Sequence, residues 1–268
     1  MYNYYNNPIE DRLVVFDHGF FGGHRSYMRE IETLCKHGYR VFAYDHTGCM
    51  ESEGETPNGM SQSLRDLNDC ISVLRAEERY KDIDISVVGH SWGGFSTLNI
   101  SALHPDISHV VVMSGFVSVE LLVNSIFGGL LSGYRKAIMD LECASNPDFV
   151  NYNAVESLRS TKAKVLLIYS KNDGMCKKAP HYDTLHKELS AIDNISFILV
   201  PNKGHNPNYT EDAVKYLNKY VSKRTALLKK GRLSTPEQKA EFVSSFDWKR
   251  MTEQDNAVWE KIFNCLDN

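Results

Sequence analysis

The sequence lacks the features of exported and membrane-spanning proteins. No stretch approaches the ~18 consecutive apolar residues that a membrane-spanning helix needs, so we expect no membrane span. Residues 1–8 have neither the basic start nor the apolar run of a signal peptide. The six cysteines show no paired spacing, which argues against a disulfide framework and against a zinc site. We therefore predict a soluble cytoplasmic protein with reduced thiols and no bound metal.

The sequence also lacks an excess of positive charge. Its formal net charge is −4, and the Lys and Arg residues are spread along the chain rather than clustered. We therefore expect no nucleic-acid partner. No internal repeat and no low-complexity tract is present. A length of 268 residues fits one large domain with an insertion, which can bury a sizeable core without disulfides or metals.

What the sequence does contain is an alternation of short apolar runs with longer segments of helical period. Runs that are apolar on both faces and separated by helices indicate a parallel sheet covered on both sides. Right-handed crossovers then give a doubly wound, mostly parallel α/β fold. The predicted strands are residues 13–16, 41–44, 85–88, 110–113, 165–169 and 195–200.

Two segments fall outside this alternation. About fifty residues, 115–163, separate the fourth and fifth predicted strands, and their apolar content predicts a helical insertion rather than a loop. The chain also continues past the last expected core helix at about 210–223, and an apolar stripe at 258–266 indicates a helical tail. We therefore divide the chain into an α/β domain at 1–224, which carries the insertion, and a helical extension at 225–268 packed on the same domain.

A G-x-S-x-G pattern, formed by Gly89, Ser91 and Gly93, directly follows the third predicted strand and opens a helix. In this context the pattern is typical of a nucleophilic serine on a sharp strand-to-helix turn. The turn leaves no room for side chains two residues before and two after the serine. It also places the hydroxyl at a helix N-terminus, where the backbone dipole favours negative charge. We predict that Ser91 is a nucleophile; the alternative is a glycine-rich turn with an incidental serine.

A serine nucleophile also needs donors for the oxyanion that it generates, and losing one typically lowers turnover by ~10²–10³. The backbone N–H of Trp92, next after the serine, is one candidate. The second should come from the loop after the first strand, where His18, Gly19 and Phe20 precede a glycine pair. We predict that the N–H of Phe20 completes this oxyanion hole. Gly19 would let the backbone approach the substrate closely, and His18 would brace the loop.

A base must take the proton from the serine hydroxyl. Of the ten histidines, His205 follows the last predicted strand and precedes a helix, at the carboxyl edge where catalytic groups gather. Asp173 follows the fifth strand at the same edge, and its carboxylate would fix the histidine tautomer and stabilise the imidazolium. Glu120, beyond the fourth strand, is the competing acid. His90 lies inside the serine turn, and we expect its side chain to point into the packing beneath.

With these residues assembled, the chain resembles the α/β-hydrolase superfamily over residues 12–223, and the order serine, aspartate, histidine is the order of that superfamily. The loop at 18–20, Asp45 before a glycine turn, and the serine turn at 89–93 are similar to those of serine aminopeptidases, monoacylglycerol lipases and small carboxylesterases. The resemblance implies hydrolysis of an ester, less often of an amide or peptide bond. It also implies no cofactor, and a lid formed by 115–163.

The chain departs from this family in three places. Only about eleven residues precede the first strand, where the family usually has an antiparallel hairpin, so the resemblance implies a shortened sheet. Met50 stands near the place of a second glycine in the loop after Asp45. Residues beyond about 225 lie outside the family core, where they could pack on the sheet edge, line the pocket or form a homodimer contact.

We therefore predict a serine hydrolase that cleaves a carboxylic ester of modest size, with an apolar acyl or aromatic part, through an acyl-enzyme on Ser91. Three alternatives stay open at this point. One is acyl transfer to an alcohol or thiol on the same triad. Another is a peptidase, in which Glu120, Asp140 or Glu142 would hold a free amine. The third is a non-catalytic ligand-binding module that keeps the fold.

Overall fold

The computed structural model describes residues 12–268. Within them, six strands form one sheet in which every neighbouring pair is parallel, in the order β2-β1-β3-β4-β5-β6. The strands are β1 (Arg12–Asp17), β2 (Arg40–Ala43), β3 (Asp84–His90), β4 (His109–Met113), β5 (Lys164–Ser170) and β6 (Ile195–Val200). Each predicted strand is present, with closely matching bounds. The residues before β1, on which the implied shortening of the sheet depends, lie outside the described part.

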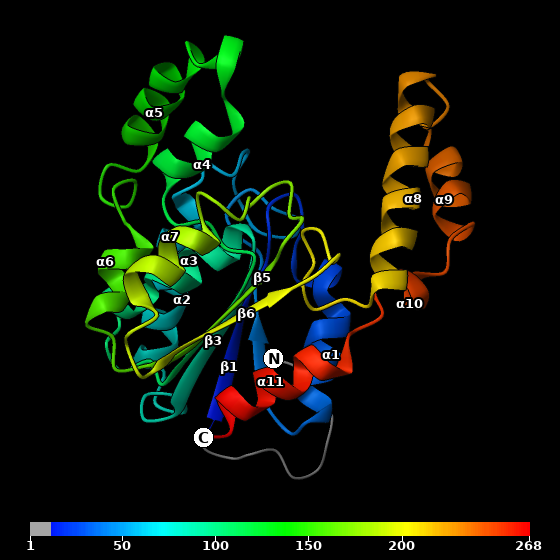
Figure 1. The fold of residues 1–268 in the computed structure, drawn as a ribbon. Helices are drawn as coiled ribbons and strands as arrows, with labels where there is room; N and C mark the ends of the chain where they lie inside the picture. Colours follow the sequence, from blue (N-terminus) through cyan, green and yellow to red (C-terminus); the bar gives the residue numbers. More distant parts are fainter. Residues whose placement is uncertain (1–11) are drawn as a thin grey trace.

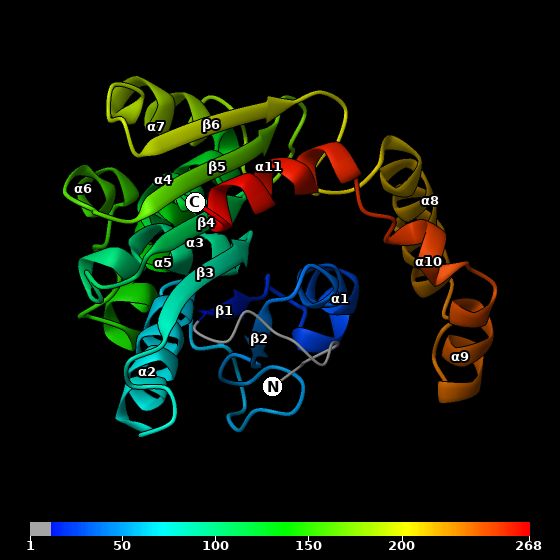
Figure 2. The ribbon, with the colours of Figure 1, turned by 90° about the horizontal axis from the view of Figure 1, so that it is seen from below.

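Helices cover both faces of this sheet, as Figure 2 shows. In β1, Leu13 and Val15 face one apolar core while Val14 and Phe16 face the other, as the alternation of side chains along a strand requires. The helices over the first core are α2 (Gln62–Ala76), α3 (Trp92–Asn99), α6 (Ala154–Arg159) and α7 (Tyr182–Leu189), and those over the second are α1 (Met28–Lys36) and α11 (Asn256–Leu266). The predicted doubly wound α/β fold is confirmed.

The insertion after β4 is helical, as expected. It contains α4 (Val119–Ile126), the short helix η3 (Gly129–Leu131) and α5 (Tyr134–Ser145), and it ends in α6. Its apolar residues do not form a single cluster. Leu122 is buried in the main core, whereas the side chain of Leu130 is fully exposed. In Figure 1, α4 and α5 rise above the sheet, so the insertion presents apolar side chains to solvent.

The helix expected to be the last of the core does not pack on the sheet. It is α8 (Glu211–Lys229), which is longer than predicted and buries only Ala213 and Val214, near its start. With α9 (Pro236–Ser244) and α10 (Trp248–Met251) it forms an arm that stands away from the sheet (Figures 1 and 2). The prediction of a core helix here is therefore wrong, because most side chains of α8 face solvent.

The last helix of the chain, α11, covers the sheet instead. Trp259, Ile262 and Leu266, which are spaced three and four residues apart, are buried against the sheet on the same face as α1. This spacing gives a helix one continuous apolar face. The end of the chain therefore contributes directly to the core of the α/β fold.

Three absences hold for residues 12–268, the part that the structure describes. No helix there is both long and apolar enough to cross a membrane. The six cysteines, all within this range, form no disulfide. No group of three or more histidine, cysteine, aspartate and glutamate side chains is arranged to hold a metal ion.

Candidate active site

Ser91 lies on a strained turn between β3 and α3. Its backbone has φ 58° and ψ −110°, in the left-handed half of conformational space, which costs a non-glycine residue about 1–3 kcal/mol. Added side chains at Gly89 or Gly93 would collide, the first with Thr97 and the second with the backbone of Asp17. The small residues of the pattern are thus required sterically, as the sequence predicts.

The structure brings Ser91, His205 and Asp173 together. The Nε2 atom of His205 lies 2.7 Å from the Oγ atom of Ser91, and its Nδ1 lies 2.9 and 3.0 Å from the two carboxylate oxygens of Asp173. The Asp173 side chain is fully buried. Its Oδ1 also accepts the backbone N–H groups of Met175 and Cys176. With Nδ1–H donating to the carboxylate, Nε2 is free to accept the hydroxyl proton.

His90 contacts the backbone of His205 from beneath the serine turn. Its Nε2–H donates to the backbone carbonyl of His205 at 2.7 Å, and its Nδ1 accepts the hydroxyl proton of Tyr27, also at 2.7 Å. Burial first, and then the charge on His205, lower the pKa of His90 to about 3, so the ring is neutral near pH 7. The predicted position of His90 beneath the turn agrees with these contacts.

Tyr27 is a residue of this site that the sequence analysis missed. Its hydroxyl oxygen accepts the backbone N–H of Gly19 at 3.1 Å while it donates to His90. A single chain of hydrogen bonds therefore runs from the oxyanion loop, through Tyr27 and His90, to the backbone of His205. No local sequence signal marks Tyr27, because its partners lie 8 and 63 residues away along the chain.

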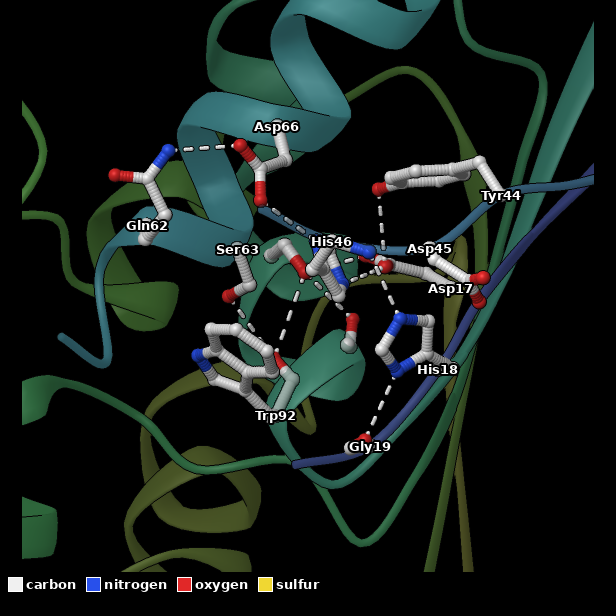
Figure 3. Close-up of polar contacts among 12 residues, drawn as sticks. Asp17, His18, Gly19, Tyr44, Asp45, His46, Gln62, Ser63, Asp66 and Trp92 are labelled. Carbon is white, nitrogen blue, oxygen red and sulfur yellow. Dashed lines mark hydrogen bonds and ion pairs between the residues drawn. The ribbon is translucent and has the colours of Figure 1, made fainter. Parts of the chain in front are cut away.

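The oxyanion loop is held by His18. The Nδ1–H of His18 donates to the carbonyl of Gly19 at 2.9 Å, and its Nε2 accepts the backbone N–H of His46, also at 2.9 Å (Figure 3). Burial first, and then the charge on His46, lower the pKa of His18 to about 4. Because the C=O and N–H of a trans peptide point in opposite directions, the bond to the Gly19 carbonyl directs the N–H of Phe20 away from His18.

Phe20 and Trp92, the two residues predicted to form an oxyanion hole, contact each other, and Trp92 directly follows Ser91 in the chain. Their rings are in edge-to-face contact with centroids 5.0 Å apart. A side chain added at Gly19 would lie 3.3 Å from the Cβ of Ser91, so this backbone passes directly against the serine. Among residues 12–268, neither the N–H of Phe20 nor that of Trp92 donates to a protein backbone acceptor. Both are available to a bound oxyanion.

A buried charged group, which the sequence analysis also missed, lies behind the oxyanion loop. The ring of His46 is fully buried between Asp17, 2.6 Å from its Nε2, and Asp66, 3.2 Å from its Nδ1 (Figure 3). Burial by itself would lower the pKa of His46, but the two carboxylates outweigh it and raise the pKa to about 9. His46 is therefore an imidazolium near neutral pH, and its backbone N–H holds His18 in place.

The competing acid does not reach the base. Glu120 is exposed on α4, and among the described residues His205 contacts the carboxylate of Asp173. Asp45, in the loop that resembles the family, accepts the backbone N–H of His24 at 2.7 Å and thereby orders the loop beside the oxyanion strand. Met50, near the place of the expected second glycine, has a positive φ of 42°, a conformation that favours glycine.

A family model described as serine aminopeptidase, S33, matches residues 9–151, which is more than half of the chain. The chain belongs to this family of α/β hydrolases. The match covers the oxyanion loop and Ser91 of the S33 hydrolase but ends before Asp173 and His205, so the assignment of these two rests on the geometry above. No curated protein sequence matches the S33 hydrolase.

Several solved structures have the same fold as this S33 hydrolase. The esterase Pf2001 of Pyrococcus furiosus is 21% identical with a TM-score of 0.58, over 83% of this chain and 84% of that chain. The monoacylglycerol lipase of Paleococcus ferrophilus is 18% identical with a TM-score of 0.53, over 75% and 88%. Est1E of Butyrivibrio proteoclasticus, solved with ferulic acid bound, is 17% identical with a TM-score of 0.59, over 82% and 92%. At these identities the likeness shows the fold alone.

A cleft of about 870 Å³ separates the oxyanion loop of the S33 hydrolase from the arm formed by α8–α10. Its lining includes Asn206, next to His205 in the chain, and Arg224 is the one charged side chain that residues 12–268 contribute to it. Six of its fourteen lining residues are aromatic: Phe20, Phe21, Tyr27, Tyr209, Tyr220 and Trp248. The cleft is therefore rich in aromatic side chains and lies next to Phe20 and to the loop that carries His205, although neither Ser91 nor His205 lines it.

Proposed function

We propose that this S33 hydrolase is a serine esterase that cleaves a carboxylic ester through an acyl-enzyme on Ser91. The observation that carries the proposal is the 2.7 Å contact between the Ser91 Oγ and the His205 Nε2, with Asp173 on the far side of the ring. An alcohol is a weak nucleophile until a positioned base takes its proton. This arrangement supplies the base and orients it.

The proposed reaction has two steps. Ser91 attacks the acyl carbonyl while His205 accepts the hydroxyl proton, and the N–H groups of Phe20 and Trp92 stabilise the tetrahedral oxyanion. His205 then protonates the leaving alcohol, which departs and leaves the acyl group on the serine. In the second step the same histidine takes a proton from water, whose oxygen attacks the acyl carbon. The bond from that carbon to the Ser91 oxygen then breaks, His205 returns the proton to Ser91, and the acid is released.

The preferred ester would be one of modest size with an apolar or aromatic part. The aromatic lining of the 870 Å³ cleft and its position beside Phe20 support this preference, since such pockets bind ligands largely by burying apolar surface. We also propose that the insertion at 115–163 acts as a lid, which the exposed apolar side chain of Leu130 supports.

A peptidase that removes N-terminal residues with the same triad would use a free carboxylate to hold the substrate amine. Two of the three candidate acids already have partners. Asp140 pairs with Lys136 at 2.7 Å on the exposed face of α5, and the buried Glu142 accepts the backbone N–H of Met60 at 2.7 Å. Of the three candidates, Glu120 is exposed and has no such contact within residues 12–268, so an aminoacyl substrate would have to be held by Glu120.

Labelling with a fluorophosphonate tests the proposed nucleophile. The reagent forms a covalent adduct with an activated serine, and we expect one adduct per chain, located on the peptide that contains Ser91. Prior incubation with a competing short ester should slow the labelling. An adduct on another residue, or no adduct in folded protein, would refute the assignment and favour a ligand-binding module.

A further inference from the structure

The C-terminal extension pairs with the loop that carries the proposed base. Residues 253–255 form an antiparallel bridge with residues 208–210, which follow His205 in the chain. Two backbone hydrogen bonds, 2.7 and 3.0 Å long, join the two segments. The segment at 253–255 directly precedes α11, which is buried against the sheet. The loop of the base is therefore tied to an element fixed in the core.

An ion pair between a buried ammonium and a partly exposed carboxylate joins the same two segments. Lys203, two residues before His205, is almost fully buried, and its Nζ lies 2.5 Å from the Oδ2 of Asp255. The same ammonium donates to the carbonyl of Tyr209. Burial would raise the pKa of the Asp255 carboxyl, but the hydrogen bond and charge of Lys203 lower it overall. A buried ammonium is stable only when it is paired and hydrogen-bonded. The charge of Lys203 is therefore stabilised only while Asp255 of the extension lies next to it.

Side-chain amides add a third connection. The Nδ2 of Asn208, a buried residue, donates to the Oε1 of Gln254 at 2.8 Å and to the Oε1 of Glu30 at 3.0 Å. The indole N–H of Trp259, in α11, donates to the same oxygen of Gln254 at 2.8 Å. Gln254 thus joins the loop of the base to a tryptophan that is itself buried in the core.

The opposite side of the loop is held by the end of β5. The backbone N–H of Lys203 donates to the Ser170 hydroxyl at 3.1 Å, and that of Gly204 donates to the Asn172 side chain at 3.0 Å. These contacts hold the residues before His205 next to the turn that carries Asp173. The residues after His205 depend on the extension for the contacts described above.

We propose that residues 253–255 form a brace that holds His205 at hydrogen-bonding distance from Ser91. Asp255 and Gln254 would then be positioning residues for the reaction. The brace lies outside residues 9–151, which match the family model. The inference rests on the proposed function, because a base must be positioned only if the serine is a nucleophile. Displacement of a catalytic group by about 1 Å can cost ~10²-fold in rate.

The substitution Asp255→Asn tests the brace, because it removes the charge facing Lys203 while keeping an oxygen acceptor. We expect kcat for a p-nitrophenyl ester to fall on the order of tenfold or more, with KM within about twofold. The matched control is Arg250→Ala, which breaks an exposed ion pair with Asp212 in the same extension and should leave kcat unchanged. Equal kcat in Asp255→Asn and wild type, or an equal loss in the control, would overturn the brace.

A double variant separates positioning from simple destabilisation. Lys203→Met with Asp255→Leu removes both charges, so no buried charge is left unpaired, but the tie between the segments is still lost. With assays run well below the melting temperature of each variant, we expect kcat to remain low. Recovery of the wild-type kcat would show that the unpaired charge of Lys203 had caused the loss in Asp255→Asn, and that the contact between the two segments is not needed for turnover.

Hydrogen–deuterium exchange tests the brace without relying on activity. In Asp255→Asn we expect the amides of 203–210 to exchange on the order of tenfold faster than in wild type, while those of β5 are unchanged. If the wild type hydrolyses no ester, the proposed function fails, and this measurement still decides whether the extension orders the loop. Unchanged exchange at 203–210 would overturn the brace even in an active enzyme.

Discussion

At the residue scale, single side chains link loops that are far apart in the sequence. The hydroxyl of Tyr27 joins the backbone of Gly19 to His90, which in turn holds the backbone of His205. The oxyanion loop and the loop of the base are therefore fixed to each other beneath Ser91. A hydroxyl that makes no hydrogen bond to Ser91 thus links the two loops on either side of it.

Removal of the Tyr27 hydroxyl tests this connection. Each neutral hydrogen bond contributes about 0.5–1.5 kcal/mol, and 1.4 kcal/mol is a factor of ten in rate. We expect Tyr27→Phe to lower kcat for a short ester on the order of tenfold. Tyr39→Phe is the control, because it removes another buried hydroxyl, bonded to Asp267 and distant from the site. A loss of kcat that is equal in the two variants would contradict a positioning role for Tyr27.

The charge on His46 predicts a dependence of stability on pH. Its pKa is about 9 in the folded protein against 6.5 for an ordinary histidine. A raised folded pKa adds stability that is complete below about pH 6.5 and is lost as the pH rises through 9. The free energy of unfolding, measured in urea, should therefore fall between pH 6 and 9.5 by on the order of a few kcal/mol more in wild type than in His46→Gln. If the free energy of unfolding changed with pH equally in the two proteins, His46 would be neutral in the folded state.

At the element scale, the sequence predicts the parts of the fold that depend on local patterns. All six strands, the serine turn, and the loops of Asp173 and His205 follow from apolar runs and from the residues at their carboxyl ends. The sequence does not predict which of α8 and α11 packs on the sheet. Both segments have helical periodicity, and the choice depends on contacts that exist only in the assembled fold. Tyr27 and His46 were missed for the same reason, because their partners are distant in sequence.

The arm formed by α8–α10 gives an element-scale prediction about substrate size. Trp248, half exposed in α10, forms part of the aromatic wall of the cleft. We expect Trp248→Ala to raise KM for octanoyl or aromatic esters several-fold, because a buried aromatic contact contributes about 1 kcal/mol or more, and to leave KM for the acetate unchanged. Val243→Ala, exposed on α9 and not in the cleft wall, is the control. An equal rise in KM for acetate would place the cleft outside the path of the acyl chain.

At the scale of the whole molecule, the site is assembled from three parts of the chain. Ser91 and Asp173 follow strands of the sheet, the two proposed oxyanion donors lie in the loop after β1 and at the start of α3, and the extension pairs with the loop that carries His205. We propose that residues 1–224 and 225–268 form one folding unit, as the burial of Trp259 and Ile262 in the core supports. The boundary at 224 falls inside α8, so the arm belongs to both.

The central claim is that Ser91 attacks an ester carbonyl, and the most direct test compares wild type with Ser91→Ala on p-nitrophenyl esters from acetate to decanoate. Both proteins should have the same circular dichroism spectrum and melting temperature within a few degrees. We expect wild type to turn over at least one ester well above background and Ser91→Ala to lose turnover by a factor of at least ~10³, as for other serine triads. Equal rates in the two folded proteins would contradict the claim.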